Sequence, residues 1–157
     1  MSEFRALASR LMQCDVAPAA VFNRARRRQP AAVLVRSTFG RMTGLVATLL
    51  LSDSAEARLL ANRFDGLHPD AADLADPSDT PALYYVWGVA GEDREDRRAA
   101  MALTERLRAD TFSDLFAYMR PATEAGRSAG ERIGFRPAGP SPDSIYVSPP
   151  TILRQVA

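Results

Sequence analysis

The chain has 157 residues, of which 46% are hydrophobic and 25% are charged, and its formal net charge is +1. This length suits one domain with a full core over residues 1–157, and the near-neutral charge argues against general electrostatic binding to nucleic acid or to an anionic membrane. The single cysteine, Cys14, excludes an intrachain disulfide and a cysteine-based zinc site, so no metal centre is expected.

The N-terminal part is predicted to form two helices, over residues 2–13 and from Pro18 to Arg28. The first is amphipathic and lacks the basic start and apolar centre of a secretory signal, and the longest apolar run, near Leu45–Leu51, is too short to span a bilayer. We therefore expect a cytoplasmic protein. The arginines between positions 24 and 28 suit the negative end of the second helix. A nucleic-acid patch is the alternative, but no basic face with interleaved aromatic residues accompanies them.

A β-hairpin is predicted next, because Ala31–Phe39 and Thr43–Leu51 are rich in Val, Leu and Thr and flank a short connection that contains glycine. Asp53 resembles the start of a helix that continues to Phe64. The composition of Asp65–Pro81 then changes to Asp, Pro, Ser and Gly, which predicts a long surface loop of the kind that is often functional. The only histidine, His68, lies in this loop and is either solvated or an acid–base group.

The remaining chain alternates between strand and helix patterns and ends in a second pair of short strands. This order predicts an α/β protein with both antiparallel and crossover connections. The predicted elements cover Ala82–Ala90, a helix to about Ala109, Asp114–Met119, Thr123–Ile133, and short strands near Phe135–Pro137 and Ile145–Ser148.

The turn from the strand Ala82–Ala90 into the next helix is a candidate anion site. The first N–H groups of a helix have no partner within the helix, and the helix dipole is positive at that end. Acidic side chains near a helix start also suit the dipole without any ligand, and they repel phosphate. Three arginines at this turn are outnumbered by four acids, Glu92, Asp93, Glu95 and Asp96.

The order of elements, the turn after Val89 and the ending Gly134-Phe135 resemble the GNAT superfamily of acyl-CoA-dependent N-acyltransferases. Members of this family carry Arg/Gln-x-x-Gly-x-Gly/Ala at the turn, where backbone N–H groups bind the pyrophosphate of coenzyme A. The resemblance implies a mixed, mostly antiparallel central sheet with helices on both faces. The residues aligned with the family motif are Arg94, Glu95, Asp96, Arg97, Arg98 and Ala99.

The match to the motif is partial. Arg94 fits its first position and Ala99 its last, but Arg97 stands where glycine is expected. Arginine removes the freedom of the backbone to approach a ligand closely and adds a cation that can contact phosphate directly. The resemblance implies that acetyl-CoA or another acyl-CoA is bound by the motif residues together with Trp87 and Val89.

The usual proton-transfer groups of the family are also replaced. Many members place a tyrosine four residues before the glycine that ends the last helix, where it protonates the leaving thiolate, and this chain has Gly130 there. Tyr85 replaces a frequent carboxylate, which leaves Tyr84 and Tyr85 as the catalytic candidates. A phenol titrates far above neutrality, so hydrogen-bond donation suits Tyr85 better than proton acceptance. By simple alternation Tyr85, Trp87 and Val89 share one strand face, so core packing is the alternative role.

The resemblance implies a transferase that moves an acyl group directly from acyl-CoA to a small-molecule or peptide amine. Phe22–Arg28 and Asp65–Pro81 are expected on the substrate side, and a homodimer is left open. The alternative is a catalytically degenerate binding or regulatory module with the same fold. The sequence shows no spacing typical of a Ser-His-Asp, Cys-His or metal site.

Overall fold

The computed structural model describes residues 2–12, 15–29, 32–140 and 144–151, so that Cys14, Ala31 and part of the predicted last loop lie outside the described residues. The order of helices and strands is the predicted one. The elements are α1 (Ser2–Met12), α2 (Ala19–Arg28), β1 (Val33–Thr38), β2 (Arg41–Leu51), α3 (Asp53–Leu60), η2 (Ala71–Asp73), β3 (Leu83–Gly91), α4 (Arg94–Arg106), η3 (Leu107–Thr111), β4 (Phe116–Met119), α5 (Glu124–Arg132), β5 (Arg136–Pro137) and β6 (Tyr146–Ser148).

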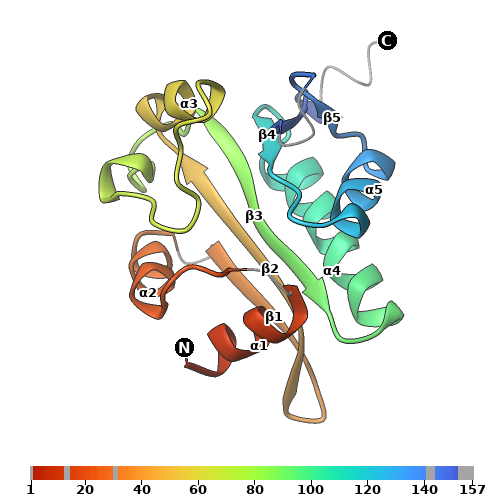
Figure 1. Cartoon of the computed structure of the whole chain (residues 1–157). Coiled ribbons are helices and arrows are strands. Elements are labelled where there is room, and N and C mark those ends of the chain that lie inside the picture. The colour runs from red at the N-terminus through yellow and green to blue at the C-terminus, as the bar shows by residue number, and fades with distance from the viewer. Residues whose placement is uncertain (1, 13–14, 30–31, 141–143, 152–157) are drawn as a thin grey trace.

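The strands form one sheet in the order β1-β2-β3-β4-β6-β5 (Figure 1). All neighbouring strands are antiparallel except β3 and β4, which run parallel. The parallel pair is joined by α4, as a crossover connection requires. The prediction of an α/β fold with a mixed, mostly antiparallel sheet is therefore confirmed.

Helices cover both faces of this sheet, as predicted. On one face α1, α2 and α3 pack against β2 and β3 through two clusters of buried residues that include Ala25, Leu45 and Leu59. On the other face α4 lies along β2 and β3, and Phe135 belongs to a third buried cluster between the sheet and α5 (Figure 1). Gly130 of α5 packs so closely on the sheet that an added Cβ would lie 2.7 Å from the sulfur of Met119.

A β-bulge in β3 changes which side chains share a face. Ala47 of β2 is opposite Gly88, but the next residue of β2 is opposite Val86, so Trp87 is the extra residue. Tyr85 and Trp87 therefore pack on the α1–α3 face, while Val89 joins the cluster on the α4 face. The prediction that Val89 shares a face with Tyr85 is wrong, because it assumed unbroken alternation.

The segment between α3 and β3 is more ordered than a plain surface loop. It contains η2, and Leu74 forms an isolated antiparallel bridge to Leu51 at the end of β2. Both Pro69 and Asp73 are fully buried, and Arg58 of α3 forms an ion pair with Asp73. This packing holds the segment against the sheet and places its first residues beside β3.

Candidate active site

A cavity of about 470 Å³ lies on the α1–α3 face of the sheet. Its walls come from α1 and the residues before α2, from β2 and β3, from the loop after α3, and from the residues that follow β4. Most of the lining is apolar, with charged groups in only three places. The charged lining residues are Asp15, Asp65 and Arg120, and the aromatic ones are Phe22, Phe64, Tyr85 and Trp87.

The cavity lies where the two parallel strands separate. β3 and β4 are paired only from Leu83 and Phe116 to Val86 and Met119. β4 then ends and the chain turns away through residues 120–122, which line the cavity, whereas β3 continues to Gly91. Beyond Val86, β3 has no strand partner on the β4 side among the described residues. The fold thus opens an edge of β3 directly beside the cavity.

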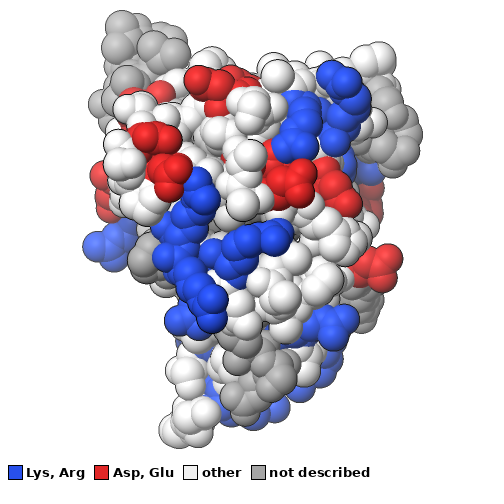
Figure 2. All heavy atoms as spheres, turned by 90° about the vertical axis from the view of Figure 1, so that its left-hand side faces the viewer, with Lys and Arg blue, Asp and Glu red and all other residues white. Residues whose placement is uncertain are grey.

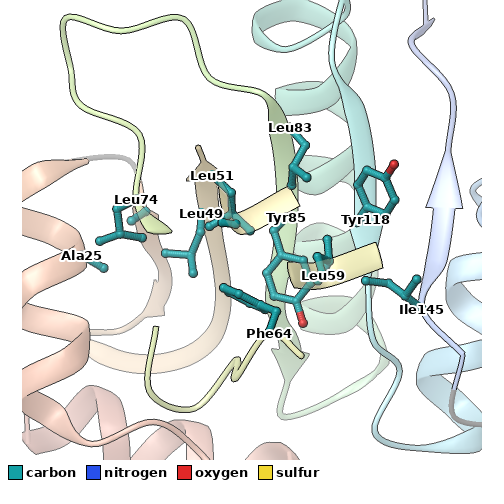
Figure 3. Packing of buried hydrophobic residues seen from close by; sticks show 12 residues of the cluster. Ala25, Leu49, Leu51, Leu59, Phe64, Leu74, Leu83, Tyr85, Tyr118 and Ile145 are labelled. Atoms are coloured by element: carbon teal, nitrogen blue, oxygen red, sulfur yellow. The ribbon is translucent and has the colours of Figure 1, made fainter. Parts of the chain in front are cut away.

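Tyr85 faces this cavity and is neutral at physiological pH. Its ring packs edge-on against Phe64, with the ring centroids 5.4 Å apart (Figure 3). Burial raises the pKa of Tyr85 to about 12, and the nearby charge of Arg120 offsets only part of this increase. A phenol with this pKa does not accept a proton from an amine at neutral pH, but it can donate a hydrogen bond.

Tyr84 lies on the opposite face and does not line the cavity. Its side chain is fully buried and stacks on Phe112, with 5.0 Å between the ring centroids. Burial also raises the pKa of Tyr84. The structure therefore separates the two tyrosines that the sequence placed side by side, and only Tyr85 is in reach of a molecule in the cavity.

A short loop beside the cavity is held in place by hydrogen bonds. The indole N–H of Trp87 donates to the carbonyl oxygen of Gly66 at 2.6 Å, and Arg24 of α2 donates to the carbonyl oxygen of Pro69 at 2.5 Å. Trp87 also packs on Phe22, with 4.5 Å between the ring centroids. The loop is thus fixed to both a strand and a helix of the same face.

Asp65 and His68 form a polar pair within this loop. Asp65 Oδ1 accepts hydrogen bonds from the backbone N–H groups of Leu67 and His68, and its Oδ2 lies 3.1 Å from His68 Nδ1. Burial alone raises the pKa of Asp65, but these hydrogen bonds outweigh burial and lower it. An ionised carboxylate can only accept, so His68 Nδ1 carries the hydrogen and Nε2 is left as the proton acceptor.

At the start of α4, a side chain next to the helix already occupies a backbone N–H group that could bind a ligand. The carboxylate of Asp93 accepts a hydrogen bond from the backbone N–H of Asp96 at 2.7 Å. Asp96 is buried, and its carboxylate binds the Thr43 hydroxyl at 3.0 Å and Arg36 Nε at 2.9 Å. Gly91 lies so near this turn that an added Cβ would be 2.4 Å from the backbone nitrogen of Arg97. Backbone donors at the helix start are therefore partly occupied before any ligand binds.

The remaining acids at this turn are paired with arginines from other elements. Glu92 forms ion pairs with Arg10 of α1 and Arg41 of β2, and Glu95 forms one with Arg36 of β1 at 2.7 Å. The expectation that these acids dominate the turn electrostatically does not allow for their partners. Among the described residues, the charges at this turn that have no ion-pair partner are those of the motif arginines and of Asp93, which is exposed and caps the helix.

Arg94, Arg97 and Arg98 are exposed, and none of them pairs with a carboxylate in the part of the chain that the structure describes. Arg97 donates only to the carbonyl oxygen of Glu92, at 3.5 Å. Ala99 is half-buried beside them. The structure therefore brings Arg94–Ala99 together at the start of α4 and Tyr85 with Trp87 at the cavity. Of the other predicted site residues, Tyr84 and Val89 face away from the cavity.

Two of the four arginines of α2 are held by other elements. Arg28 is paired with Asp76 at 2.6 Å, and Arg24 is held by the loop as described above. Figure 2 shows this side of the molecule, where basic and acidic side chains lie next to one another. None of the helices that the structure describes is long and apolar enough to cross a membrane. Within the described ranges, no group of three His, Cys, Asp or Glu side chains is placed to hold a metal ion.

The three charged cavity residues, Asp15, Asp65 and Arg120, were not predicted as site residues. Asp65 begins the loop that the sequence marked as functional, and the sequence Asp-Gly-Leu-His is compatible with a turn in which the carboxylate binds the following N–H groups. Arg120 follows a strand directly and precedes Pro121, which directs the chain out of the sheet. Both signals were present, but neither identifies a cavity without the fold.

No protein-family model and no curated protein matches the sequence. Three solved structures are similar at the level of the fold. An N-acetyltransferase from Staphylococcus aureus Mu50 is 15% identical, with a TM-score of 0.42, over 74% of this chain and 67% of that chain. A structure described as histone acetyltransferase HPA2 and related acetyltransferase from Corynebacterium glutamicum ATCC 13032 is 23% identical, with a TM-score of 0.47, over 83% and 72%.

The third structure is AtaTR bound with AcCoA, which is 10% identical, with a TM-score of 0.43, over 83% of this chain and 78% of that chain. All three similarities are distant, and they assign no activity to this chain.

Proposed function

We propose that the protein is an acyl-CoA-dependent acyltransferase that moves an acyl group, with acetyl as the first choice, directly to an amine. The observation that carries the proposal is the separation of the parallel strands β3 and β4 beside a cavity lined by Tyr85. An acyl-CoA has a narrow arm with two amide groups, which suits the open edge of a strand. The thioester at the end of the arm would then enter the cavity.

The phosphates of the acyl-CoA are assigned to the start of α4. Asp93 occupies the N–H of Asp96, and Arg97 replaces the motif glycine, so this chain cannot rely on backbone donors alone. Three exposed guanidinium groups supply charged donors instead, and arginine suits phosphate because its planar group can bind two oxygens at once. In the proposed site, arginine side chains therefore bind the phosphates in place of the backbone N–H groups of a glycine-rich turn.

The chemistry requires a neutral amine whose nitrogen attacks the thioester carbon. The new C–N bond forms, the C–S bond breaks, and the proton lost from nitrogen must be taken up while the thiolate leaves. Tyr85 would donate a hydrogen bond to the oxygen or sulfur that gains negative charge. His68 is exposed and is not among the cavity-lining residues, so the amine proton would reach its Nε2 through water, with Asp65 fixing the tautomer.

Calorimetric titration with acetyl-CoA tests the proposal. We expect saturable binding, and Arg94→Ala and Arg97→Ala should each weaken it about fivefold, because each removes a charged contact to phosphate. Arg106→Ala is the matched control, since Arg106 lies at the other end of the same helix and pairs with Asp110. If folded protein gives no binding heat at millimolar acetyl-CoA, the proposal is wrong.

The second candidate is a binding or regulatory module without acyl transfer. The closed start of α4 favours it, because Asp93 and Asp96 use groups that a pyrophosphate would need. Assaying the release of the coenzyme A thiol with a panel of amines separates the two candidates. Binding of acetyl-CoA without amine-dependent thiol release would support the module, whereas release that requires an amine would support the enzyme.

A further inference from the structure

We propose that the cavity on the α1–α3 face binds an amine that carries an apolar, preferably aromatic, group, with its ammonium group at Asp65 and Asp15. This inference rests on the proposed function, because it names the class of acceptor. The cavity binds the amine on its own, however, so the inference can be tested without acyl-CoA. Its volume of about 470 Å³ is within the range of small-molecule sites.

The apolar part of the ligand is specified by the cavity walls. Two aromatic pairs line the cavity, Phe22 with Trp87 and Phe64 with Tyr85, whose ring centroids are 4.5 and 5.4 Å apart. Figure 3 shows the ring of Phe64 against that of Tyr85 within the buried cluster. A ring or alkyl group placed among these side chains is removed from water, which is the main source of affinity for such a ligand.

The positive charge of the ligand is specified by two carboxylates in the lining. Asp65 accepts hydrogen bonds from two backbone N–H groups, which lower its pKa, and its Oδ2 lies 3.1 Å from His68 Nδ1. Its side chain is 58% exposed, so an ammonium group can approach it from the edge of the cavity. Asp15 lies between α1 and α2, lines the cavity and is exposed. Aromatic faces also attract cations, so the walls and the carboxylates favour the same charge.

The one basic group of the lining does not reverse this preference. Arg120 donates from Nη2 to Asn62 Oδ1 at 2.7 Å, and its charge acts on Tyr85. It follows β4 directly, at the opening where the thioester is proposed to enter. This position suits the acyl oxygen rather than the acceptor, because negative charge develops on that oxygen during transfer.

Trp87 provides a direct test, because it is the only tryptophan of the chain and lines the cavity. Its fluorescence would be followed while the full-length protein, without acyl-CoA, is titrated with 2-phenylethylamine. Matched ligands are 2-phenylethanol, which lacks the charge, and 3-phenylpropanoate, which reverses it. We expect saturation with the amine and an affinity about fivefold lower, or more, for the alcohol and the anion.

Asp65→Asn is the matched variant, because asparagine keeps the oxygen that accepts the loop N–H groups and removes the charge. It should weaken the amine about fivefold and leave the alcohol unchanged, which a loss of loop structure would not do. The inference is overturned if the amine gives no saturable change, if the anion or the alcohol binds as tightly, or if Asp65→Asn binds the amine normally. Since acyl-CoA is absent, none of these outcomes affects the acetyl-CoA titration.

Discussion

The cavity and the start of α4 use charge in opposite ways. The cavity is built of apolar and aromatic side chains with three charged residues in its lining, and Asp65 is the carboxylate that is held most firmly there. The start of α4 is rich in charge, but its acids already have partners. Asp93 caps the helix, the buried Asp96 binds Arg36, and Glu92 forms ion pairs with Arg10 and Arg41. Charge counted along the sequence therefore overstates the repulsion at α4 and does not reveal which charged residues line the cavity.

This difference assigns separate tasks to the two regions. A rigid, closed turn keeps α4 in register with β2 and leaves the motif arginines facing solvent. An apolar cavity with two carboxylates in its lining is the proposed site of a small organic cation. The following predictions test this division and are given in order of decreasing effect.

Gly91→Ala should destabilise the protein most. The new Cβ would lie 2.4 Å from the backbone nitrogen of Arg97, and backbone atoms at a helix start cannot move aside easily. We expect a loss of about 3 kcal/mol in the free energy of unfolding, measured by urea denaturation. Gly88→Ala is the control, because its Cβ meets only the flexible end of Met12 at 3.2 Å. Equal stability of the two variants would contradict the close packing of this turn.

Asp96→Ala should cost about 2 kcal/mol in the free energy of unfolding, because it removes a buried carboxylate from Arg36 and Thr43. Glu95→Ala removes a neighbouring carboxylate from the same arginine, but the Glu95 side chain is 80% exposed, so we expect about 0.5 kcal/mol or less. Thermal or urea unfolding of both variants measures the difference. If they cost the same, Asp96 is not the anchor of α4.

Tyr85→Phe should lower turnover about tenfold while leaving the affinity for acetyl-CoA nearly unchanged, because it removes a donor to developing charge. Tyr84→Phe is the control on the opposite face. Since the pKa of Tyr85 is raised to about 12, its hydroxyl stays protonated below that pH and is lost as donor only above it. If the protein is an acyltransferase as proposed, its rate should therefore show no decline from this group up to pH of about 10. Unchanged turnover would remove Tyr85 from the mechanism.

Asp93→Asn should produce the smallest effect, a roughly threefold tighter binding of acetyl-CoA at nearly constant stability. Asparagine caps a helix about as well as aspartate but carries no charge beside the proposed phosphate position. Asp93→Ala should instead cost about 1 kcal/mol of stability through loss of the cap. Calorimetry and urea unfolding of the pair test both statements. Weaker binding by the asparagine variant would place the phosphates elsewhere.

The fold was largely predictable from the sequence because its signals are local. The element order was predicted from glycines at turns, from strand-forming runs and from the threonine before α5. Thr123 does cap that helix, because its hydroxyl accepts a hydrogen bond from the N–H of Gly126. The face of Val89 was not predictable, since the bulge at Trp87 depends on how β3 aligns with β2.

The site was less predictable because it depends on distant contacts. Arg41 and Glu92 are far apart in sequence, so the neutralisation of the α4 start follows only from the fold. The cavity likewise combines Asp65 with Arg120 through the separation of two strands. Motif positions identified Tyr85 and Trp87, but they could not separate Tyr84 from them.

The most direct test of the proposed function is a crystal structure of the protein with acetyl-CoA. We expect the arm of the ligand between β3 and β4, the thioester within hydrogen-bond distance of the Tyr85 hydroxyl, and the pyrophosphate against Arg94, Arg97 or Arg98. A ligand bound elsewhere, or one whose thioester lies on the Tyr84 face, would contradict the proposal that this opening is an acyl-transfer site.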